Sequence, residues 1–205
     1  MHRRTNQDSL TSRLVSITHA VAFTATVLFT LLLAPHVEAQ LKSPGRHARY
    51  HVELEPHLVW QWTGDEAARD DGIGVGFRAS IPVIDNGPVP TINNNLAITF
   101  GLAWAYFPEC RGFDDCDEND FWVPITAQWN FFLTEMISVF PEVGLGFRHA
   151  SFAYDFACTR RDCRTSSLEV HPIVLFGARF RVTDLVAVVV RLGTPSLNLG
   201  ASFFF

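Results

Sequence analysis

The 205-residue sequence predicts an all-β fold, an eight-stranded antiparallel up-and-down transmembrane β-barrel that follows a cleaved signal peptide. Three observations predict it. Eight segments alternate apolar with polar or tiny residues, an apolar N-terminal stretch follows several arginines, and the last alternating segment ends on Phe205. Alternation with a period of two puts successive side chains on opposite faces of a β-strand.

The N-terminus has the pattern of an export signal. Arg3, Arg4 and Arg13 precede an apolar stretch over residues 14–33, and the small-x-small sequence Val37-Glu38-Ala39 follows it. This order is typical of a signal peptide. We therefore expect a signal peptide at 1–39, an N-terminal periplasmic segment at 40–49 and the barrel at 50–205. An uncleaved membrane anchor is the alternative, because the stretch is about twenty residues long.

The first four strands are placed by the parity of their apolar residues, at 50–62, 72–84, 96–107 and 121–131. In the first strand, Tyr50 and every second residue up to Trp62 share the outer face, whereas His51 and His57 point inward. Aromatic residues are expected to gather at the outer rim, as in the interfacial belts of membrane proteins. These residues are Trp60, Trp62, Tyr106, Phe121 and Trp122.

The last four strands are expected at 137–148, 168–180, 186–192 and 197–205. Val189 weakens the alternation of the seventh. Long connections are expected on the extracellular side at 63–71, 108–120 and 149–167, with short periplasmic turns at 133–136 and 181–184. Two connections depart from this rule, a long periplasmic turn at 85–95 and a short outer loop at 193–196.

Strand length and polarity favour a membrane barrel over a secreted lipocalin. Eleven residues at about 3.3 Å each, tilted by about 40°, rise roughly 28 Å, which matches an apolar band of about 25 Å. A lipocalin would place its apolar residues inside, around a ligand. Here the apolar face lies outward and carries no charged residue. An even number of strands returns both ends of the barrel to the periplasm.

The inward face carries a balanced set of charges. Four acidic residues and four arginines form the predicted interior charge network: Glu53, Glu55, Arg78, Glu142, Arg148, Glu169, Arg179 and Arg191. Hairpin geometry puts Arg78 diagonal to Glu55 or beside His57, and it puts Arg148 across the third outer loop from Glu169. Because the interior of an eight-stranded barrel is just wide enough for its side chains, we expect a filled polar plug. A narrow or gated pore is the alternative.

Four cysteines fall as two close pairs within predicted outer loops. In an oxidising envelope we expect the disulfides Cys110–Cys116 and Cys158–Cys163. Three connectivities are open in principle, and a shared zinc site has the wrong spacing. The first of these loops is acidic, with Glu118 and Asp120 among its residues, and is expected to be a solvated tip. Loops held in shape by disulfides tend to present a surface.

The alternating ending from Leu197 to Phe205 resembles the C-terminal assembly signal of small outer-membrane barrels of the OmpA, OmpX and OmpW type. The resemblance covers residues 50–205. It implies integral location in the bacterial outer membrane, with contact to outer-membrane lipid and lipopolysaccharide, and Phe205 as the signal that the barrel-assembly machinery reads. The OmpW resemblance also implies a conduit for small, possibly apolar solutes.

The tripeptide His149-Ala150-Ser151 resembles the His-x-Ser motif of the outer-membrane lipid A deacylases. That resemblance implies a Ser151 nucleophile and a His149 base, with Asp155 or Asp162 to orient the histidine. Phe152 stands where that family has a polar Asn. We therefore expect a chance match and no enzyme.

These observations predict a porin-like envelope protein with a structural or surface-interaction role through its disulfide-stapled extracellular loops, where an extracellular ligand is an open question. The alternatives are the solute conduit and, third, a lipid A-modifying hydrolase. No cofactor, metal site or nucleic-acid partner is expected. His51 and His57 are too far apart for one metal, because six residues of strand span roughly 20 Å.

Overall fold

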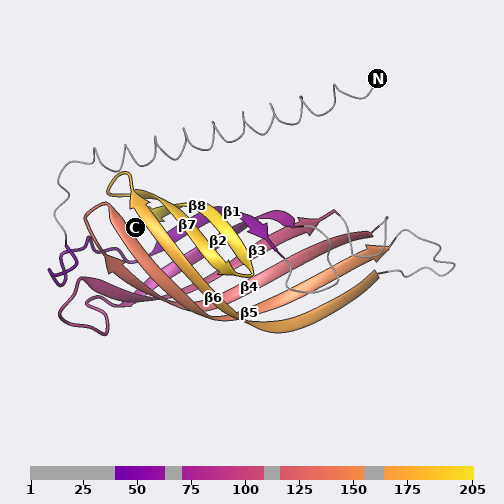
Figure 1. Ribbon diagram of the computed structural model, residues 1–205, viewed down its shortest axis with the longest axis horizontal. Helices are drawn as coiled ribbons and strands as arrows, with labels where there is room; N and C mark the ends of the chain where they lie inside the picture. The colour runs from indigo at the N-terminus through magenta and orange to yellow at the C-terminus, as the bar shows by residue number, and fades with distance from the viewer. Residues whose placement is uncertain (1–39, 63–70, 109–115, 155–163) are drawn as a thin grey trace, which may run out of the picture. The chain divides into compact units, whose positions relative to one another are not determined.

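The computed structural model describes residues 40–62, 71–108, 116–154 and 164–205. They form eight strands: β1 (Glu53–Gln61), β2 (Gly72–Ile84), β3 (Asn94–Phe107), β4 (Cys116–Phe132), β5 (Ile137–Tyr154), β6 (Arg164–Arg181), β7 (Val186–Thr194) and β8 (Ser196–Phe204). Each strand is antiparallel to its neighbours, and β1 pairs with β8 to close the barrel (Figure 1). The predicted fold class is confirmed. Within the described residues no helix is long and apolar enough to cross a bilayer.

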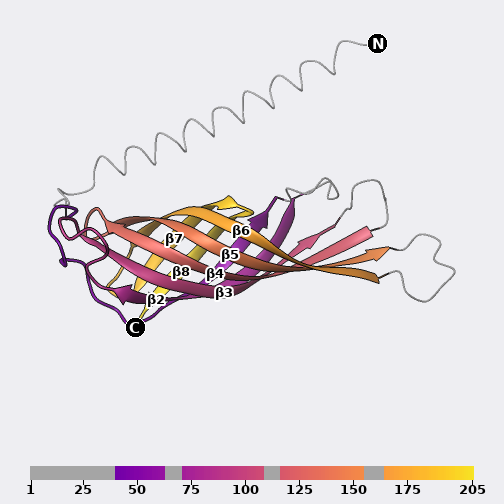
Figure 2. The same cartoon turned by 90° about the horizontal axis from the view of Figure 1, so that it is seen from below.

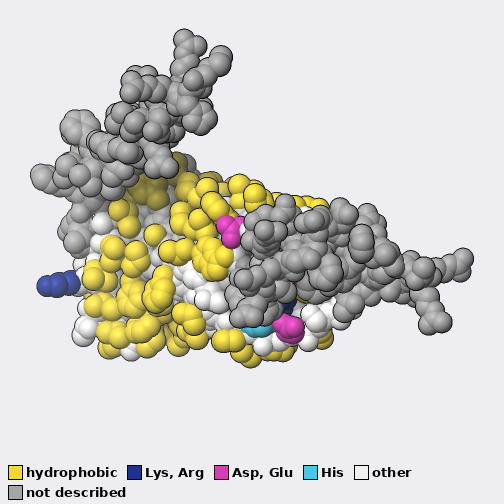
Figure 3. Space-filling model, turned by 45° about the vertical axis from the view of Figure 1, so that its right-hand side comes forward, with side chains coloured by type: hydrophobic (Ala, Val, Ile, Leu, Met, Phe, Trp, Pro, Cys, Tyr) yellow, Lys and Arg dark blue, Asp and Glu magenta, His cyan; other side chains and the backbone are white. Residues whose placement is uncertain are grey.

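The outer face of the barrel is apolar, as the alternation predicts. Leu58, Ile73, Leu102 and Val170 are examples of large apolar side chains that are more than half exposed. Figure 3 shows such side chains gathered on the outer surface. No exposed Asp, Glu, Lys or Arg occurs among the strand positions whose side chains the structure describes. A charge at mid-depth on this face would cost about 2–4 kcal/mol in a bilayer.

One end of the barrel holds the beginning of β1 and the end of β8, and we call it the terminal mouth. Residues 40–52 fold against it and are fixed by backbone hydrogen bonds from Gln40 to Leu133 (2.8 Å) and from Asn93 to Leu41 (2.8 Å). Gly87 has a φ of 55° in the turn after β2, a conformation that favours glycine. We call the opposite end the loop end.

The expected outward position of Tyr50 is wrong. Its side chain is buried and packs edge-on against the buried Phe204, with ring centroids 5.0 Å apart, whereas His51 is exposed. The strand begins only at Glu53, and the amide of His51 donates to the carbonyl of Phe205 (2.6 Å). Because residues before Glu53 bend across the terminal mouth, the parity of β1 does not extend to them.

Trp122 also departs from the expected aromatic rim. Trp60 and Phe121 are about half exposed on the outer face, but Trp122 is 7% exposed and points inward. Phe121 is odd-numbered and outward in β4, so its neighbour Trp122 must face the other side. The aromatic cluster at the rim therefore has one member fewer than predicted.

Three strands extend at the loop end by four or more residues beyond their predicted limits. The expected loops 108–120 and 149–167 are partly strand, because β4, β5 and β6 continue pairing out to Cys116, Tyr154 and Arg164. β7 and β8 are short, and β6 pairs with β7 only from Val174 onward. Figure 2 shows β5 and β6 reaching beyond the hairpin of β7 and β8 at the loop end.

Candidate functional site: the interior charge network

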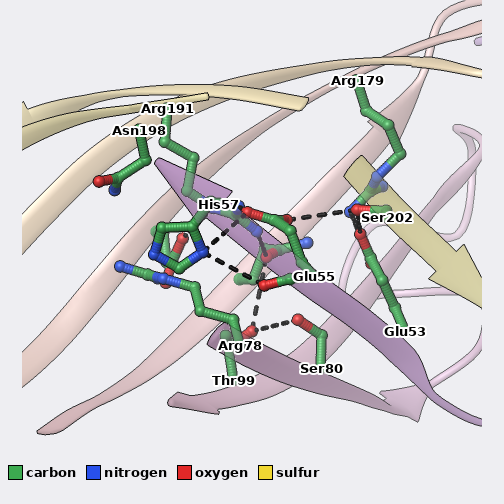
Figure 4. Close-up of polar contacts among 12 residues, drawn as sticks. Glu53, Glu55, His57, Arg78, Ser80, Thr99, Arg179, Arg191, Asn198 and Ser202 are labelled. Carbon is green, nitrogen blue, oxygen red and sulfur yellow. Dashed lines mark hydrogen bonds and ion pairs between the residues drawn. The ribbon is translucent and has the colours of Figure 1, made fainter. Parts of the chain in front are cut away.

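The centre of the barrel is occupied by Arg191 of β7, whose side chain is fully buried. Its guanidinium pairs with Glu55 of β1, donates through Nε to Glu142 Oε2 of β5 (3.0 Å) and through Nη2 to Gln128 Oε1 of β4 (3.3 Å). Figure 4 shows Arg191 and Glu55 meeting in the interior. Strands from opposite walls are thereby joined through one side chain.

Glu142 is shared by two arginines. Arg78 of β2 pairs with Oε1 of Glu142, and the hydroxyl of Thr126 donates to the same oxygen. Arg78 lies directly opposite Glu55 in the β1–β2 register, rather than diagonal to it or beside His57 as expected, and it pairs across the lumen with Glu142. Glu55 is instead engaged by Arg191, so the central cluster alternates acid and base.

Gly177 makes room for the ring of Phe140, which lies beside this cluster. A Cβ on Gly177 would lie 2.2 Å from the ring of Phe140. That buried ring has Arg179 at 5.0 Å and Arg191 at 4.9 Å from its centroid. Cation–π contacts of this kind stabilise a desolvated guanidinium. Phe140 therefore separates the central arginine from the one nearer the terminal mouth.

Arg179 forms a second cluster towards the terminal mouth. Its Nη2 donates to both carboxylate oxygens of Glu53 at 2.7 Å, and the hydroxyl of Ser202 also donates to Glu53. These residues come from β6, β1 and β8. Tyr50 lies beside them, and its burial raises the pKa of its hydroxyl to about 12. The phenol is therefore neutral at any ordinary pH.

Arg148 of β5 organises a third cluster towards the loop end. It forms two hydrogen bonds to Asp120, Nε to Oδ2 at 2.8 Å and Nη2 to Oδ1 at 3.1 Å, and one to Glu118 at 2.6 Å. Gln61 donates to Asp120 as well (2.8 Å). The expected partner, Glu169, lies opposite Arg148 in the register and forms a longer ion pair with it, with Arg148 Nη1 3.6 Å from Glu169 Oε2.

The expectation that Glu118 and Asp120 belong to a solvated loop tip is wrong. Both are on β4, point inward and are almost fully buried against Arg148. The sequence does not single them out, because a run of acidic residues is typical of a loop beyond the end of a strand. The signal was nevertheless present, since the inward parity of Thr126 extends through Asp120 to Glu118.

Among the described residues, the small inward residues are closely covered by neighbouring side chains or backbone. A Cβ on Gly146 would meet Ile173 and Trp122, and one on Gly101 would meet Arg78. A cavity of about 20 Å³ lies beside His57 and Arg78, which is room for about one water molecule. In the described part of the chain the interior is therefore filled by side chains.

The two catalytic candidates from the sequence, His149 and Ser151, lie outside the interior charge network. His149 and Ser151 are on β5, His149 exposed on the outer face and paired in register with Leu168, and Ser151 opposite Ser166. No described carboxylate forms an ion pair with His149. Asp155 and Asp162 lie outside the described residues, as do the predicted disulfides Cys110–Cys116 and Cys158–Cys163. Where side chains are described, no group of three acidic, His or Cys residues could hold a metal ion.

No family model and no curated protein matches the chain. Among solved structures, the outer-membrane protein Ail of Yersinia pestis is similar at 14% identity, covering 77% of this chain and all of that one, with a TM-score of 0.50. Neisserial surface protein A is similar at 12% identity, covering 76% of this chain and 97% of that one, also with a TM-score of 0.50. The chain therefore has the fold of the small eight-stranded outer-membrane β-barrels that its sequence resembles.

Proposed function

We propose that the protein is an integral outer-membrane barrel with a sealed lumen, and that it acts as a structural or surface-interaction protein through its two ends. The observation that carries this proposal is the fully buried Arg191 held between Glu55 and Glu142. Opening a pore there would separate buried charges, and leaving one such charge without its partner costs about 3–5 kcal/mol. Ion passage would have to supply that energy at every crossing.

The apolar outer belt supports the membrane location, because an apolar surface that surrounds a barrel of this strand length matches the hydrocarbon layer of a bilayer. The signal at 1–39, its cleavage, and recognition of Phe205 by the barrel-assembly machinery are parts of the same proposal. Phe205 lies on the outer face, 63% exposed, and its backbone pairs with Val52. Lipopolysaccharide would meet the outward aromatic residues near the loop end.

The loop end would carry the surface-interaction role. β5 and β6 extend beyond their neighbours, and the cluster of Arg148 with Asp120 and Glu118 ties β4 to β5 where they leave the barrel. The disulfides proposed for the connections beyond these strands would hold them in shape. Removing both pairs of cysteines by substitution with Ser should abolish ligand capture at the cell surface while leaving the barrel folded.

Osmotic swelling of proteoliposomes tests the sealed lumen. Wild-type protein is expected to admit no small sugar, whereas Arg78→Ala with Glu142→Ala should admit the smallest solutes because it removes two of the four charged side chains of the central cluster. Arg49→Ala, an exposed arginine before β1, is the matched control and should behave as wild type. Swelling with the wild-type protein would make the solute conduit the leading function.

The lipid A hydrolase is tested separately. Overexpression of the wild-type protein is expected to leave lipid A species unchanged by mass spectrometry. A deacylated species that disappears with Ser151→Ala would instead assign catalysis to His149 and Ser151.

A further inference from the structure

A cavity of about 230 Å³ lies at the terminal mouth, between residues 40–48 and the turns that follow β4 and β6. Its wall is rich in hydrogen-bond donors and cations. These include Arg46, His47, Thr134, Ser138, Arg179 and Arg181. The cavity is more than ten times the volume of the space beside His57 and exceeds the roughly 30 Å³ that one water occupies in the liquid.

Arg181 is a cation in this wall that forms no ion pair with a described carboxylate. It lies half-buried at the end of β6 with its guanidinium 4.9 Å from the ring centroid of Phe204. Within the described residues, no carboxylate comes within 4.0 Å of it, whereas the neighbouring Arg179 is neutralised by Glu53. Two guanidinium groups thus lie over one aromatic ring, and only one of them has an anion.

Two hydroxyl groups add donors to the same wall. Thr134 Oγ1 accepts hydrogen bonds from the amides of Ile137 (2.8 Å) and Met136 (3.2 Å), and Ser138 Oγ accepts one from Arg179 (3.3 Å). Because their oxygens already act as acceptors, their hydroxyl hydrogens are left to donate. Across residues 40–62, 71–108, 116–154 and 164–205, neither hydroxyl donates to any protein acceptor.

The wall also contains two acids, Glu135 and Asp184. Glu135 accepts a hydrogen bond from Gln40 at 2.9 Å, which holds it on the N-terminal segment. Asp184 is exposed in the turn after β6 and forms no ion pair with Arg181. Among the described residues of the wall, the less exposed groups that lack a partner, Arg181 and the two hydroxyls, are donors, whereas Asp184 is an exposed acid that would oppose a bound anion.

We propose that this cavity binds a phosphate-type oxyanion, with Arg181 as the principal cation and the hydroxyls of Thr134 and Ser138 as donors. Guanidinium groups bind such anions through charge-assisted hydrogen bonds. The phosphate group would belong either to soluble phosphate or to the headgroup of a phospholipid at the adjacent membrane surface. The second source fits the exposed apolar side chains of Met136, Val182 and Leu185 on the flanking turns. Placing this end in the periplasm rests on the proposed function, but the anion site itself does not.

The test is calorimetric titration of the purified full barrel with inorganic phosphate in a phosphate-free zwitterionic detergent. Saturable heat is expected, with binding about tenfold or more weaker in Arg181→Gln because a charged hydrogen-bond donor is lost. Arg49→Gln makes the same charge change outside the cavity and should bind within twofold of wild type. Asp184→Asn should bind more tightly, and it keeps the test decisive if Arg181→Gln fails to fold.

A second arm distinguishes the two sources. The protein is reconstituted in phosphatidylcholine nanodiscs with and without phosphatidic acid, and retained lipid is measured by native mass spectrometry. Retention of phosphatidic acid that requires Arg181, without heat from free phosphate, identifies the headgroup as the ligand. Absence of both signals, or equal binding by Arg181→Gln and wild type, overturns the proposal. None of these outcomes depends on whether the lumen conducts.

Discussion

Arg191 donates from Nε to Glu142 Oε2 across the barrel interior at 3.0 Å, and both side chains are fully buried. The two residues lie 49 positions apart in sequence, on β7 and β5, which are not neighbours in the barrel. Their contact therefore crosses the lumen rather than following the wall. This contact helps to fill the interior, and the proposed function depends on a filled interior.

Arg191→Met should destabilise the barrel by about 3–5 kcal/mol, because it leaves Glu55 buried with less compensation. Urea unfolding in lipid vesicles, followed by tryptophan fluorescence, measures the loss. Adding Glu55→Gln to Arg191→Met should recover part of it, since the uncompensated carboxylate is then removed. A single variant within about 0.5 kcal/mol of wild type, the range of ordinary surface substitutions, would show that the centre is not held by this pair.

Asp120→Asn should loosen the paired extension of β4 and β5 at the loop end. The variant loses the charge that Arg148 binds through two hydrogen bonds. Hydrogen exchange of the amides from Glu118 to Phe121 should accelerate, while amides of β1 keep their protection. The exposed Asp71 provides the control as Asp71→Asn, and unchanged exchange in Asp120→Asn would argue against this cluster as a clamp.

Docking of residues 40–52 should weaken as pH falls. Burial lowers the pKa of His47, whose ring stacks on Phe132 at 4.2 Å and bonds to Asn93. The docked segment thus favours the neutral ring, and an undocked histidine has an ordinary pKa near 6.5. The free energy of docking is therefore most favourable above about pH 6.5, and docking becomes weaker as the pH falls below that value.

Limited proteolysis of this segment between pH 8 and pH 5 measures the effect. Cleavage should rise at the acidic end in the wild type, and His47→Phe should flatten the dependence. The exposed His51 serves as a control, because His51→Gln should leave the dependence in place. A pH dependence that survives His47→Phe would assign it to another group.

Gly177→Ala should destabilise the barrel by about 1–3 kcal/mol through overpacking. The new methyl group would meet the ring of Phe140 at 2.2 Å, and that ring is fixed between Arg179 and Arg191. Thermal unfolding of Gly177→Ala, with Ala178→Gly on the outer face as control, measures this. Combination with Phe140→Leu should restore stability; a neutral single variant would mean that the ring moves aside freely.

The period-two pattern predicted the architecture well because a barrel in lipid imposes it directly. Each wall residue faces either hydrocarbon or the lumen, so the placement of Leu58 outward and Arg78 inward follows from parity. The alternation does not predict side-chain positions for residues that lie outside the barrel strands. Tyr50 precedes the first hydrogen-bonded pair of β1 and is free to turn into the terminal mouth.

The sequence predicts which residues form the interior charge network better than it predicts which of them form ion pairs with one another. Register places Arg78 opposite Glu55, yet its partner is Glu142 on a distant strand, because long side chains reach across a lumen that narrow. Asp120 was missed for a different reason. A run of acids looks like a solvated loop unless the arginine that neutralises it, here Arg148, is already placed beside it.

Single-channel recording in planar bilayers tests the sealed lumen most directly, with oxidised wild-type protein beside the double variant Arg78→Ala, Arg148→Ala. The filled interior predicts a silent wild type and stepwise currents in the variant, since the central cluster loses one of its two arginines and the loop-end cluster loses Arg148. Steady, protein-dependent conductance of the wild type would contradict the sealed barrel.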